Sequence, residues 1–271
     1  MQRIFRGNTA GTAYTARSVK ASYYAEYATI QSTHWWYLAR ADILESLLSQ
    51  HIQAARTQCL LDLGCGPGGM RPMLSRFGRL VSTDFTFDAL QFCKAQCLDH
   101  LVAADGMKQP FRDASFDAAC VFDVIEHLPD DAQAAHELCR VLKPGGTAVI
   151  TVPAYQWLWG RQDIVSHHCR RYNAPQLRDL LTGAPFEILK LSYFNTFLFP
   201  PVAAVRLTFR LLGLNSGKTA DDVQSDLSIA HQGIVNTALR KLFAAEKMLL
   251  RYGDFPFGVS LLCVARKPAS A

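Results

Sequence analysis

A glycine-rich segment, DLGCGPGG at positions 62–69, constrains the fold of this chain more than any other stretch. It directly follows the apolar run CLL and precedes a stretch with helical spacing, 70–77. Glycines at such a junction allow a tight turn from a strand into a helix and let a ligand approach bare backbone amides. Gly64, Gly66 and Gly69 also satisfy GxGxxG, which by itself is a weak dinucleotide fingerprint. The segment therefore predicts a nucleotide-like ligand, and the surrounding sequence must identify it.

From Cys59 onward, short apolar runs alternate with helical stretches. The runs are CLLDLG, RLVSTD, HLVAAD, SFDAACVFD and GTAVITVP, followed after a further helix by PFEILKLSYF and finally by FGVSLLCVARKP. Such alternation is typical of βαβ units, and it predicts an α/β fold built on a mostly parallel, Rossmann-like sheet.

Three segments are predicted: an N-terminal arm with a cap helix (1–55), a core (56–194 and 258–271) and a helical insertion before the last strand (195–257). The insertion opens with TFLFPPVAAV, which is shorter than the roughly 20 residues of a membrane-spanning helix and contains two prolines. Two readings of it remain open. It either caps the active site or lies in a lipid interface, giving peripheral membrane contact through 193–214.

Composition excludes several classes of protein. With 49% hydrophobic and 19% charged residues, the chain is not disordered, and its net charge of +5 is too scattered to indicate nucleic-acid binding. Eight cysteines without a charged-then-apolar leader at Met1 predict free thiols and a cytoplasmic location, with membrane association left open. Composition does not indicate the oligomeric state.

Three carboxylates follow three successive predicted strands. Asp62 precedes the first glycine, where it can receive an ammonium group directly or through a water. Asp84 comes 22 residues later, at the spacing of a carboxylate that accepts both ribose hydroxyls. Asp105 can accept a hydrogen bond from an adenine amino group, while Gly106 or Met107 offers a backbone N–H. The set suits a nucleoside with a cationic amino-acid tail better than a pyrophosphate.

Together with FDAACVFDVIEHL (116–128) and LKPGG (142–146), these residues resemble the class I S-adenosylmethionine-dependent methyltransferases over 58–153. The resemblance implies a seven-stranded sheet with an antiparallel last strand, S-adenosylmethionine lying across the carboxyl ends of the first strands, and an acceptor site above it. The expected cofactor-binding residues are Asp62, Gly64, Cys65, Gly66, Gly68, Asp84, Asp105, Gly106, Met107, Phe122 and Arg40.

Other motifs resemble a bacterial subgroup, types 11 and 12, often associated with cell-surface glycan or lipid assembly. These motifs are the WW-x-x-x-R frame of Trp35, Trp36 and Arg40, the stretch from VPAYQWLW to RRY, and PFGVSLLCVAR near the C-terminus. Arg40 is expected to reach the cofactor carboxylate. The alternative, also open, is that the two tryptophans simply fix the N-terminal helix to the core.

In-line methyl transfer asks the protein for alignment, exclusion of water and, where needed, deprotonation of the acceptor. Asp123, Glu126 and His127 stand at i, i+3 and i+4, which predicts one side of a short helix. The pattern resembles the ubiquinone-biosynthesis O-methyltransferases, where such residues are associated with a metal. We predict no metal and assign His127 as a base or acceptor-site wall, with the cation site as the less favoured alternative.

A cluster of aromatic and basic residues follows the fifth predicted strand, and we expect it to line the acceptor site. His168 in this cluster is the expected general base, the alternative being that it caps the following helix. The expected substrate-binding residues are Tyr155, Trp157, Trp159, Arg161, Arg170 and Tyr172.

The sequence thus predicts a methyltransferase that acts on oxygen of a small-molecule, glycan or lipid-linked acceptor. One alternative is an NAD(P)-dependent oxidoreductase, which GxGxxG alone supports, without a Tyr-x-x-x-Lys pair and without a role for Asp105. The other is a catalytically inactive cofactor-binding scaffold, which the intact glycine segment and three acids disfavour.

Overall fold

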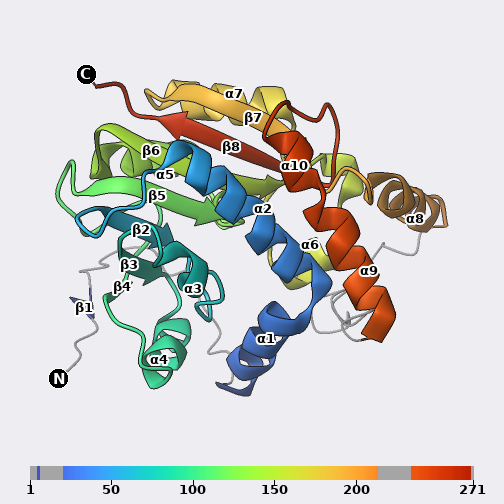
Figure 1. The fold of residues 1–271 in the computed structure, drawn as a ribbon, viewed down its shortest axis with the longest axis horizontal. Helices are drawn as coiled ribbons and strands as arrows, with labels where there is room; N and C mark the ends of the chain where they lie inside the picture. Colours follow the sequence, from blue (N-terminus) through green and yellow to red (C-terminus); the bar gives the residue numbers. More distant parts are fainter. Residues whose placement is uncertain (1–4, 7–20, 213–232, 270–271) are drawn as a thin grey trace.

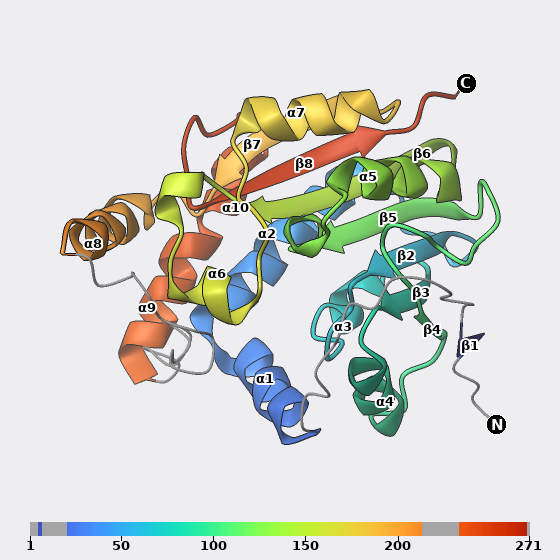
Figure 2. The same cartoon turned by 180° about the vertical axis from the view of Figure 1, so that it is seen from behind.

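The computed structural model describes residues 5–6, 21–212 and 233–269. Within them, helices cover both faces of one mixed sheet of eight strands (Figure 1, Figure 2). In spatial order the strands are β1 (Phe5–Arg6), β4 (Leu101–Ala103), β3 (Arg79–Asp84), β2 (Cys59–Leu63), β5 (Phe116–Phe122), β6 (Leu142–Pro153), β8 (Ser260–Arg266) and β7 (Glu187–Phe194). The last strand, β8, is antiparallel to both of its neighbours, whereas the other pairs are parallel.

The predicted seven-stranded sheet is therefore confirmed, and β1 is an addition at its edge. Two residues are too few to produce a hydrophobic pattern, so β1 was not predicted.

Strands β2, β5, β6, β7 and β8 each contribute to two cores, because consecutive side chains point to opposite faces of the sheet. Leu61 packs in the core with α5 (Asp131–Val141) and α7 (Ala174–Gly183), and the adjacent Leu60 packs in the core with α2 (Trp35–His51). Burial on both faces explains why these strands read as nearly continuous apolar runs.

Helix α2 belongs to the core although it precedes the first long strand. Its residues Ile43, Leu44 and Leu48 are fully buried at helical spacing, and His34 caps the helix by accepting a hydrogen bond from the Trp36 amide at 3.2 Å. Truncating one such leucine to alanine costs about 2–5 kcal/mol of folding free energy. The burial of α2 also fixes the position of Arg40 in its middle.

The smaller elements connect the strands. They are α1 (Ala21–Thr33), α3 (Arg71–Leu74), α4 (Phe87–Ala95), η1 (Ile125–His127), η2 (Gln156–Leu158) and α6 (Arg161–Val165). The helix expected over 70–77 is shorter than predicted, since α3 has only four residues. All eight cysteines are free thiols, as predicted.

The predicted insertion contains α8 (Phe199–Leu211), α9 (Gly233–Ala244) and α10 (Glu246–Leu250). Residues 213–232 of the insertion lie outside the described residues, as do residues 1–4 and 7–20 of the predicted N-terminal segment. Helix α9 packs on α2: the Asn236 side chain accepts a hydrogen bond from the Trp35 amide at 2.7 Å and donates one to the Thr33 carbonyl at 3.0 Å. In the described part of the chain, no helix has the length and apolar character required to cross a bilayer.

Candidate cofactor and acceptor site

The glycine segment forms a loop between β2 and α3, and its backbone requires glycine. Gly64 and Gly68 have φ angles of +74° and +85°, a region that other residues rarely adopt. A side chain at Gly64 would also collide with Val124. The amides of Gly64 and Cys65 both donate to the Thr83 carbonyl at 2.8 Å, which ties the loop to the end of β3.

Asp84, at the end of β3, holds the same loop from the other side. One of its carboxylate oxygens accepts a hydrogen bond from the Gly66 amide and the other from the Thr86 amide, each at 2.8 Å. Burial raises the pKa of Asp84, although these two amides oppose the effect. Asp84, which is predicted to bind the ribose hydroxyls, therefore also stabilises the glycine loop.

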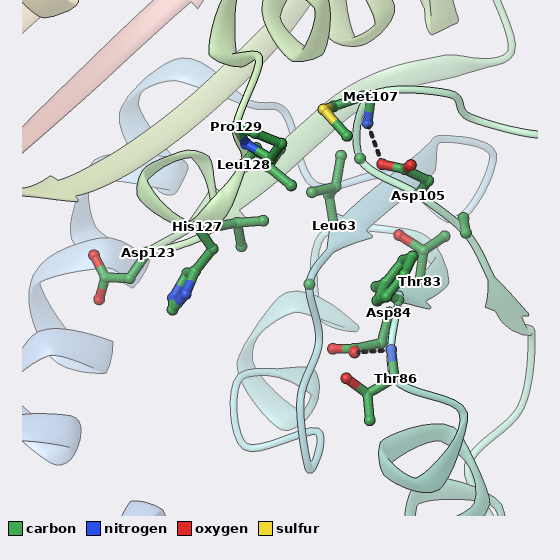
Figure 3. Close-up of a pocket in the computed structure, with 15 residues that line it drawn as sticks. Leu63, Thr83, Asp84, Thr86, Asp105, Met107, Asp123, His127, Leu128 and Pro129 are labelled. Atoms are coloured by element: carbon green, nitrogen blue, oxygen red, sulfur yellow. Dashed lines mark hydrogen bonds between the residues drawn. The ribbon is translucent and has the colours of Figure 1, made fainter. Parts of the chain in front are cut away.

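A cavity of about 420 Å³ opens beside this loop, within the range of about 300–1,000 Å³ typical of small-molecule sites. Asp84 and Asp105 lie on one of its sides, and Asp123 and His127 lie on another (Figure 3). The remaining lining residues are Leu63, Gly64, Thr83, Phe85, Thr86, Ala104, Gly106, Met107, Val124, Leu128 and Pro129. The carboxyl ends of β2, β3 and β5 thus converge on one cavity.

Asp62 lies outside the cavity lining. It is buried behind the loop, where it accepts a hydrogen bond from the Ser82 hydroxyl at 3.3 Å. Burial, with a smaller contribution from the Asp84 charge, raises the pKa of Asp62 to about 7. A cationic group near it would therefore favour its ionised form.

The backbone amide of Met107 is already in use, because it donates to Asp105 Oδ1 at 2.8 Å (Figure 3). The Gly106 and Met107 amides were both expected to face an adenine ring, and the Met107 amide instead forms this hydrogen bond within its own turn. Cys65, Gly66 and Gly68 lie in the glycine loop without lining the cavity, and their role in cofactor binding stays a prediction.

Asp123 follows β5 in a left-handed conformation, with φ of +55°. Arg40 Nη2 lies 2.8 Å from Asp123 Oδ2 and donates to the Thr151 hydroxyl at 2.7 Å. The guanidinium group also lies over the rings of Trp36 and Phe122, at 4.9 and 5.6 Å from their centroids. Arg40 therefore connects α2 to the strand ends, and its contact with a cofactor carboxylate stays a prediction.

The expected grouping of Asp123 with Glu126 and His127 on one side of a helix is wrong. The helix η1 spans only Ile125–His127, and Asp123 precedes it, turned toward Arg40. A different set comes together, in which one ligand-type atom each from Glu126, His127 and His168 lies within 4.8 Å of the others. The prediction from the i, i+3, i+4 spacing assumed a regular helix. The left-handed backbone of Asp123 interrupts that helix.

His168 lies between two carboxylates. Its Nδ1 is 2.8 Å from Asp163 Oδ1, and its Nε2 is 4.0 Å from Glu126 Oε1. Although burial raises the pKa of Asp163, the hydrogen bond from His168 and the Arg171 guanidinium outweigh it and hold that pKa at about 2. Asp163 had no role assigned from the sequence, because only the fold brings it to His168.

His127 connects this group to the cavity. It lines the cavity and meets the His168 ring edge to face, with centroids 4.6 Å apart. Burial, followed by the neighbouring His168, lowers the pKa of His127 to about 4, so its imidazole is neutral at physiological pH.

Comparison with known proteins shows that this chain is similar to methyltransferases. Residues 61–150 match the type 11 family described as methyltransferase domain. Cycloartenol-C-24-methyltransferase of Arabidopsis thaliana is 30% identical over 153 residues, covering 51% of this chain and 44% of that protein. The chloroplastic tocopherol O-methyltransferase of the same plant is 32% identical over 134 residues, covering 43% and 38%.

The chain contains a class I S-adenosylmethionine-dependent methyltransferase domain over residues 61–150. Its matches span less than half the length of these two curated relatives. Among solved structures, Haemonchus contortus phosphoethanolamine N-methyltransferase 2 in complex with S-adenosyl-L-methionine has a TM-score of 0.58 at 19% identity, covering 92% of this chain and 57% of that one. That likeness shows the fold.

S-adenosylmethionine is the cofactor of this family, and the cavity of this methyltransferase fits it. The carboxylate of Asp84 stands at the cavity wall beside Phe85, whose side chain is 45% exposed and offers an aromatic face to a purine. Phe85 was not predicted. Its position directly after a strand-end acid was the signal that would have identified it.

The residues predicted to bind the acceptor separate into two groups in this methyltransferase. Tyr155 and Trp157 stack at 5.6 Å and pack against Phe199 of α8, and the Arg161 guanidinium lies over Phe209 of the same helix.

The second group converges on Asp131: Arg170 pairs with it at 2.6 Å, and the Tyr172 hydroxyl donates to it at 2.7 Å. Trp159 is half-buried. The six residues thus do not form one continuous wall, and their role in acceptor binding stays a prediction.

Proposed function

We propose that this methyltransferase transfers a methyl group from S-adenosylmethionine to an oxygen atom of a small-molecule, glycan or lipid-linked acceptor. The observation that carries the proposal is the placement of His127, a neutral imidazole, in the same cavity as Asp84 and Asp105. Nucleoside-binding acids and an imidazole at opposite sides of one cavity suit transfer to a hydroxyl group that has to lose its proton.

When bound, S-adenosylmethionine supplies a methyl group on a positively charged sulfur, which keeps the electron pair of the broken bond. The chain itself orients the nucleoside through Asp84 and the glycine loop. Leu128 and Pro129 line the cavity next to His127 and give that wall an apolar surface. We place removal of the acceptor proton at the His127–His168 pair, whose second member is held in position by Asp163.

A lipid-linked acceptor is supported by the surface formed by α8, α9, α10 and the two residues that follow α10, which we call the α8–α10 surface. In both views α8 and α9 lie at the same end of the molecule (Figure 1, Figure 2). Its exposed apolar residues are Val205, Leu207, Leu211, Leu212, Ile234, Val235, Leu242, Met248, Leu249 and Tyr252.

The charge of the α8–α10 surface is positive. Its basic residues are Arg206, Arg210, Arg240, Lys241, Lys247 and Arg251, and its one acid, Glu246, is fully buried. The rest of the chain has 22 basic and 22 acidic residues (28 less 6, and 23 less 1), so this surface accounts for the net charge. Apolar and basic side chains together favour peripheral contact with an anionic bilayer.

The function is tested with the full chain and S-adenosylmethionine carrying a ¹³C- and tritium-labelled methyl group. The protein is incubated with aqueous and organic extracts of cells, and label is followed into each fraction. The ¹³C chemical shift of the product then identifies the methylated atom. We expect label in the organic fraction, on oxygen, and markedly less label with the Asp84→Asn variant at a cofactor concentration below saturation.

Each other outcome has a definite meaning. Label on nitrogen or carbon contradicts O-methylation and leaves the methyltransferase assignment intact. Absence of protein-dependent label in every fraction, with cofactor binding retained in calorimetry, favours an inactive scaffold. Binding of NAD without binding of S-adenosylmethionine would support the oxidoreductase alternative.

A further inference from the structure

Glu126 carries a buried carboxylate without a partner. Its side chain is fully buried, and neither of its oxygens accepts a hydrogen bond from another described residue. A buried carboxylate in this state costs several kcal/mol unless it is neutralised or a cation compensates it. Among the described residues no group hydrogen-bonds this carboxyl, which makes it a candidate ligand for a bound cation.

Burial keeps the pKa of Glu126 well above its usual range, because the charges of Arg40 and Arg171 only partly oppose the effect of burial and each guanidinium is paired with another carboxylate. Arg40 pairs with Asp123 at 2.8 Å, and Arg171 pairs with Asp163 at 2.7 Å. Glu126 is thus the acid of this buried cluster that has no paired arginine, and a cation bound beside it would favour its ionised form.

Two imidazoles each bring a nitrogen atom to within 4.8 Å of a Glu126 carboxylate oxygen and of each other. His168 Nδ1 is hydrogen-bonded to Asp163 at 2.8 Å, which leaves Nε2 facing Glu126 at 4.0 Å. His127 is hydrogen-bonded to the backbone of Ser166 and presents its ring to His168. An imidazole whose second nitrogen is bound to a carboxylate or carbonyl is the usual form of a metal-ligating histidine.

We propose that Glu126, His127 and His168 bind a divalent first-row transition-metal cation that orients the acceptor oxygen. This inference rests on the proposed function and replaces the sequence-based expectation of a metal-free site. Two imidazole nitrogens and one carboxylate oxygen form a donor set that suits Zn²⁺, Fe²⁺ or Mn²⁺ better than Mg²⁺, which prefers oxygen alone.

The present spacing requires a modest contraction. Metal–ligand bonds of about 2.0–2.2 Å place ligand atoms about 3 Å apart around one cation, whereas the three atoms here lie within 4.8 Å of one another. Because His127 lines the cavity, the cation lies at the cavity wall with coordination positions that the chain does not fill.

This position gives the cation a chemical role. A hydroxyl oxygen bound to it has a lowered pKa and releases its proton to solvent. The oxygen lone pair then forms the bond to the methyl carbon as the carbon–sulfur bond breaks, and its electron pair stays on sulfur. In this scheme the cation takes over the role of base that was assigned above to the His127–His168 pair, and both imidazoles become its ligands. Asp163 acts as a positioning residue through His168.

The test is direct metal binding by the tag-free full chain, stripped with a chelator and titrated with Mn²⁺, Zn²⁺ and Co²⁺ in calorimetry, with Co²⁺ also followed by its visible absorption. We expect one equivalent per chain. Glu126→Gln keeps the side-chain shape, and His168→Asn keeps the donor to Asp163 while it removes Nε2. Both should abolish stoichiometric binding, and Asp163→Asn should weaken it about ten- to a hundredfold.

The matched control is His167→Asn, because His167 is exposed, adjacent in sequence and in a left-handed conformation that asparagine tolerates. This variant should bind the cation as the unchanged chain does. If the Glu126→Gln variant does not fold, loss or retention of metal binding in His168→Asn alone tests the site. The site is overturned if the unchanged chain binds no stoichiometric cation, or if the two ligand variants bind it normally.

Failure of the metal site is distinguishable from failure of the proposed function. Affinity for S-adenosylmethionine is measured on the same stripped samples and should be unchanged. Methyl transfer that resists a chelator shows that the function holds without the cation and contradicts the proposal.

Discussion

Arg40 and Asp123 form an ion pair, with Nη2 2.8 Å from Oδ2, that joins the middle of α2 to the carboxyl end of β5. Arg40 is 4% exposed, and Asp123 lines the cofactor cavity. The pair therefore links the packing of the N-terminal helix to the shape of the site.

We expect Arg40→Met to lower the free energy of unfolding by about 3–5 kcal/mol, because it leaves Asp123 without its partner in a largely buried position. The control is Arg76→Met, which breaks the exposed pair with Glu45 and should cost less than about 1 kcal/mol. Urea denaturation measures both changes. Equal losses in the two variants would show that the Arg40 pair is no more important than a surface pair.

Asp84→Asn should weaken binding of S-adenosylmethionine by about tenfold or more, since charged hydrogen bonds contribute about 1.5–3 kcal/mol and 1.4 kcal/mol is a factor of ten. Asparagine keeps the shape of the side chain that holds Gly66. Asp113→Asn, which removes one carboxylate far from the cavity, is the matched control. Calorimetry measures both variants, and unchanged affinity after Asp84→Asn would exclude Asp84 from the cofactor site.

Cofactor binding should release a proton from Asp62 near neutral pH. Its pKa of about 7 reflects burial and the Asp84 charge, opposed by Ser82 and Arg71, and a bound ammonium group would lower it. The binding enthalpy should therefore depend on the ionisation enthalpy of the buffer at about pH 6.5 and lose this dependence in Asp62→Asn. A buffer-independent enthalpy in the unchanged chain would contradict the prediction.

The same pKa predicts the sign of a stability effect. The folded chain holds the Asp62 proton up to about pH 7, whereas the unfolded chain releases it near the ordinary value of 3.8. Stability gained from the neutral form is thus lost as pH rises from about 4 to 7. Relative to the unchanged chain, Asp62→Asn should become more stable over this range, as thermal unfolding at successive pH values will show.

The α8–α10 surface should bind vesicles containing anionic lipid, with weaker binding at higher salt. Arg210→Glu and Leu211→Ser should each reduce co-sedimentation, because they remove a positive charge and a side chain that is 86% exposed. Arg112→Glu makes the same charge change at an exposed position elsewhere and should leave binding nearly unaffected. Equal binding to neutral vesicles would contradict the electrostatic part of the proposal.

Local patterns predicted the part of the site that lies at strand ends. Asp84 and Asp105 follow apolar runs whose carboxyl ends share one edge of a parallel sheet, so their common cavity follows from the order of the strands. The glycines were equally readable, because Gly64 and Gly68 adopt backbone conformations that few other residues accept.

The histidine group was not predictable in the same way. Glu126 and His168 meet because α6 and its following turn fold back onto η1, and the backbone amide of Cys169 donates to the Glu126 carbonyl at 2.7 Å. Asp123 was misplaced because its left-handed backbone breaks the helical spacing from which its position was inferred. Such long-range pairings depend on loop geometry, for which the sequence has no periodic signal.

The antiparallel strand β8 lies between β6 and β7, and it is the sole hydrogen-bonded neighbour of β7 among the described strands. During synthesis β7 leaves the ribosome well before Ser260–Arg266, and until then it has no partner and the outer side of β6 is open. The domain consequently cannot finish folding co-translationally while the insertion is being made. A nascent chain stalled within the insertion should expose two strand edges and depend on chaperones.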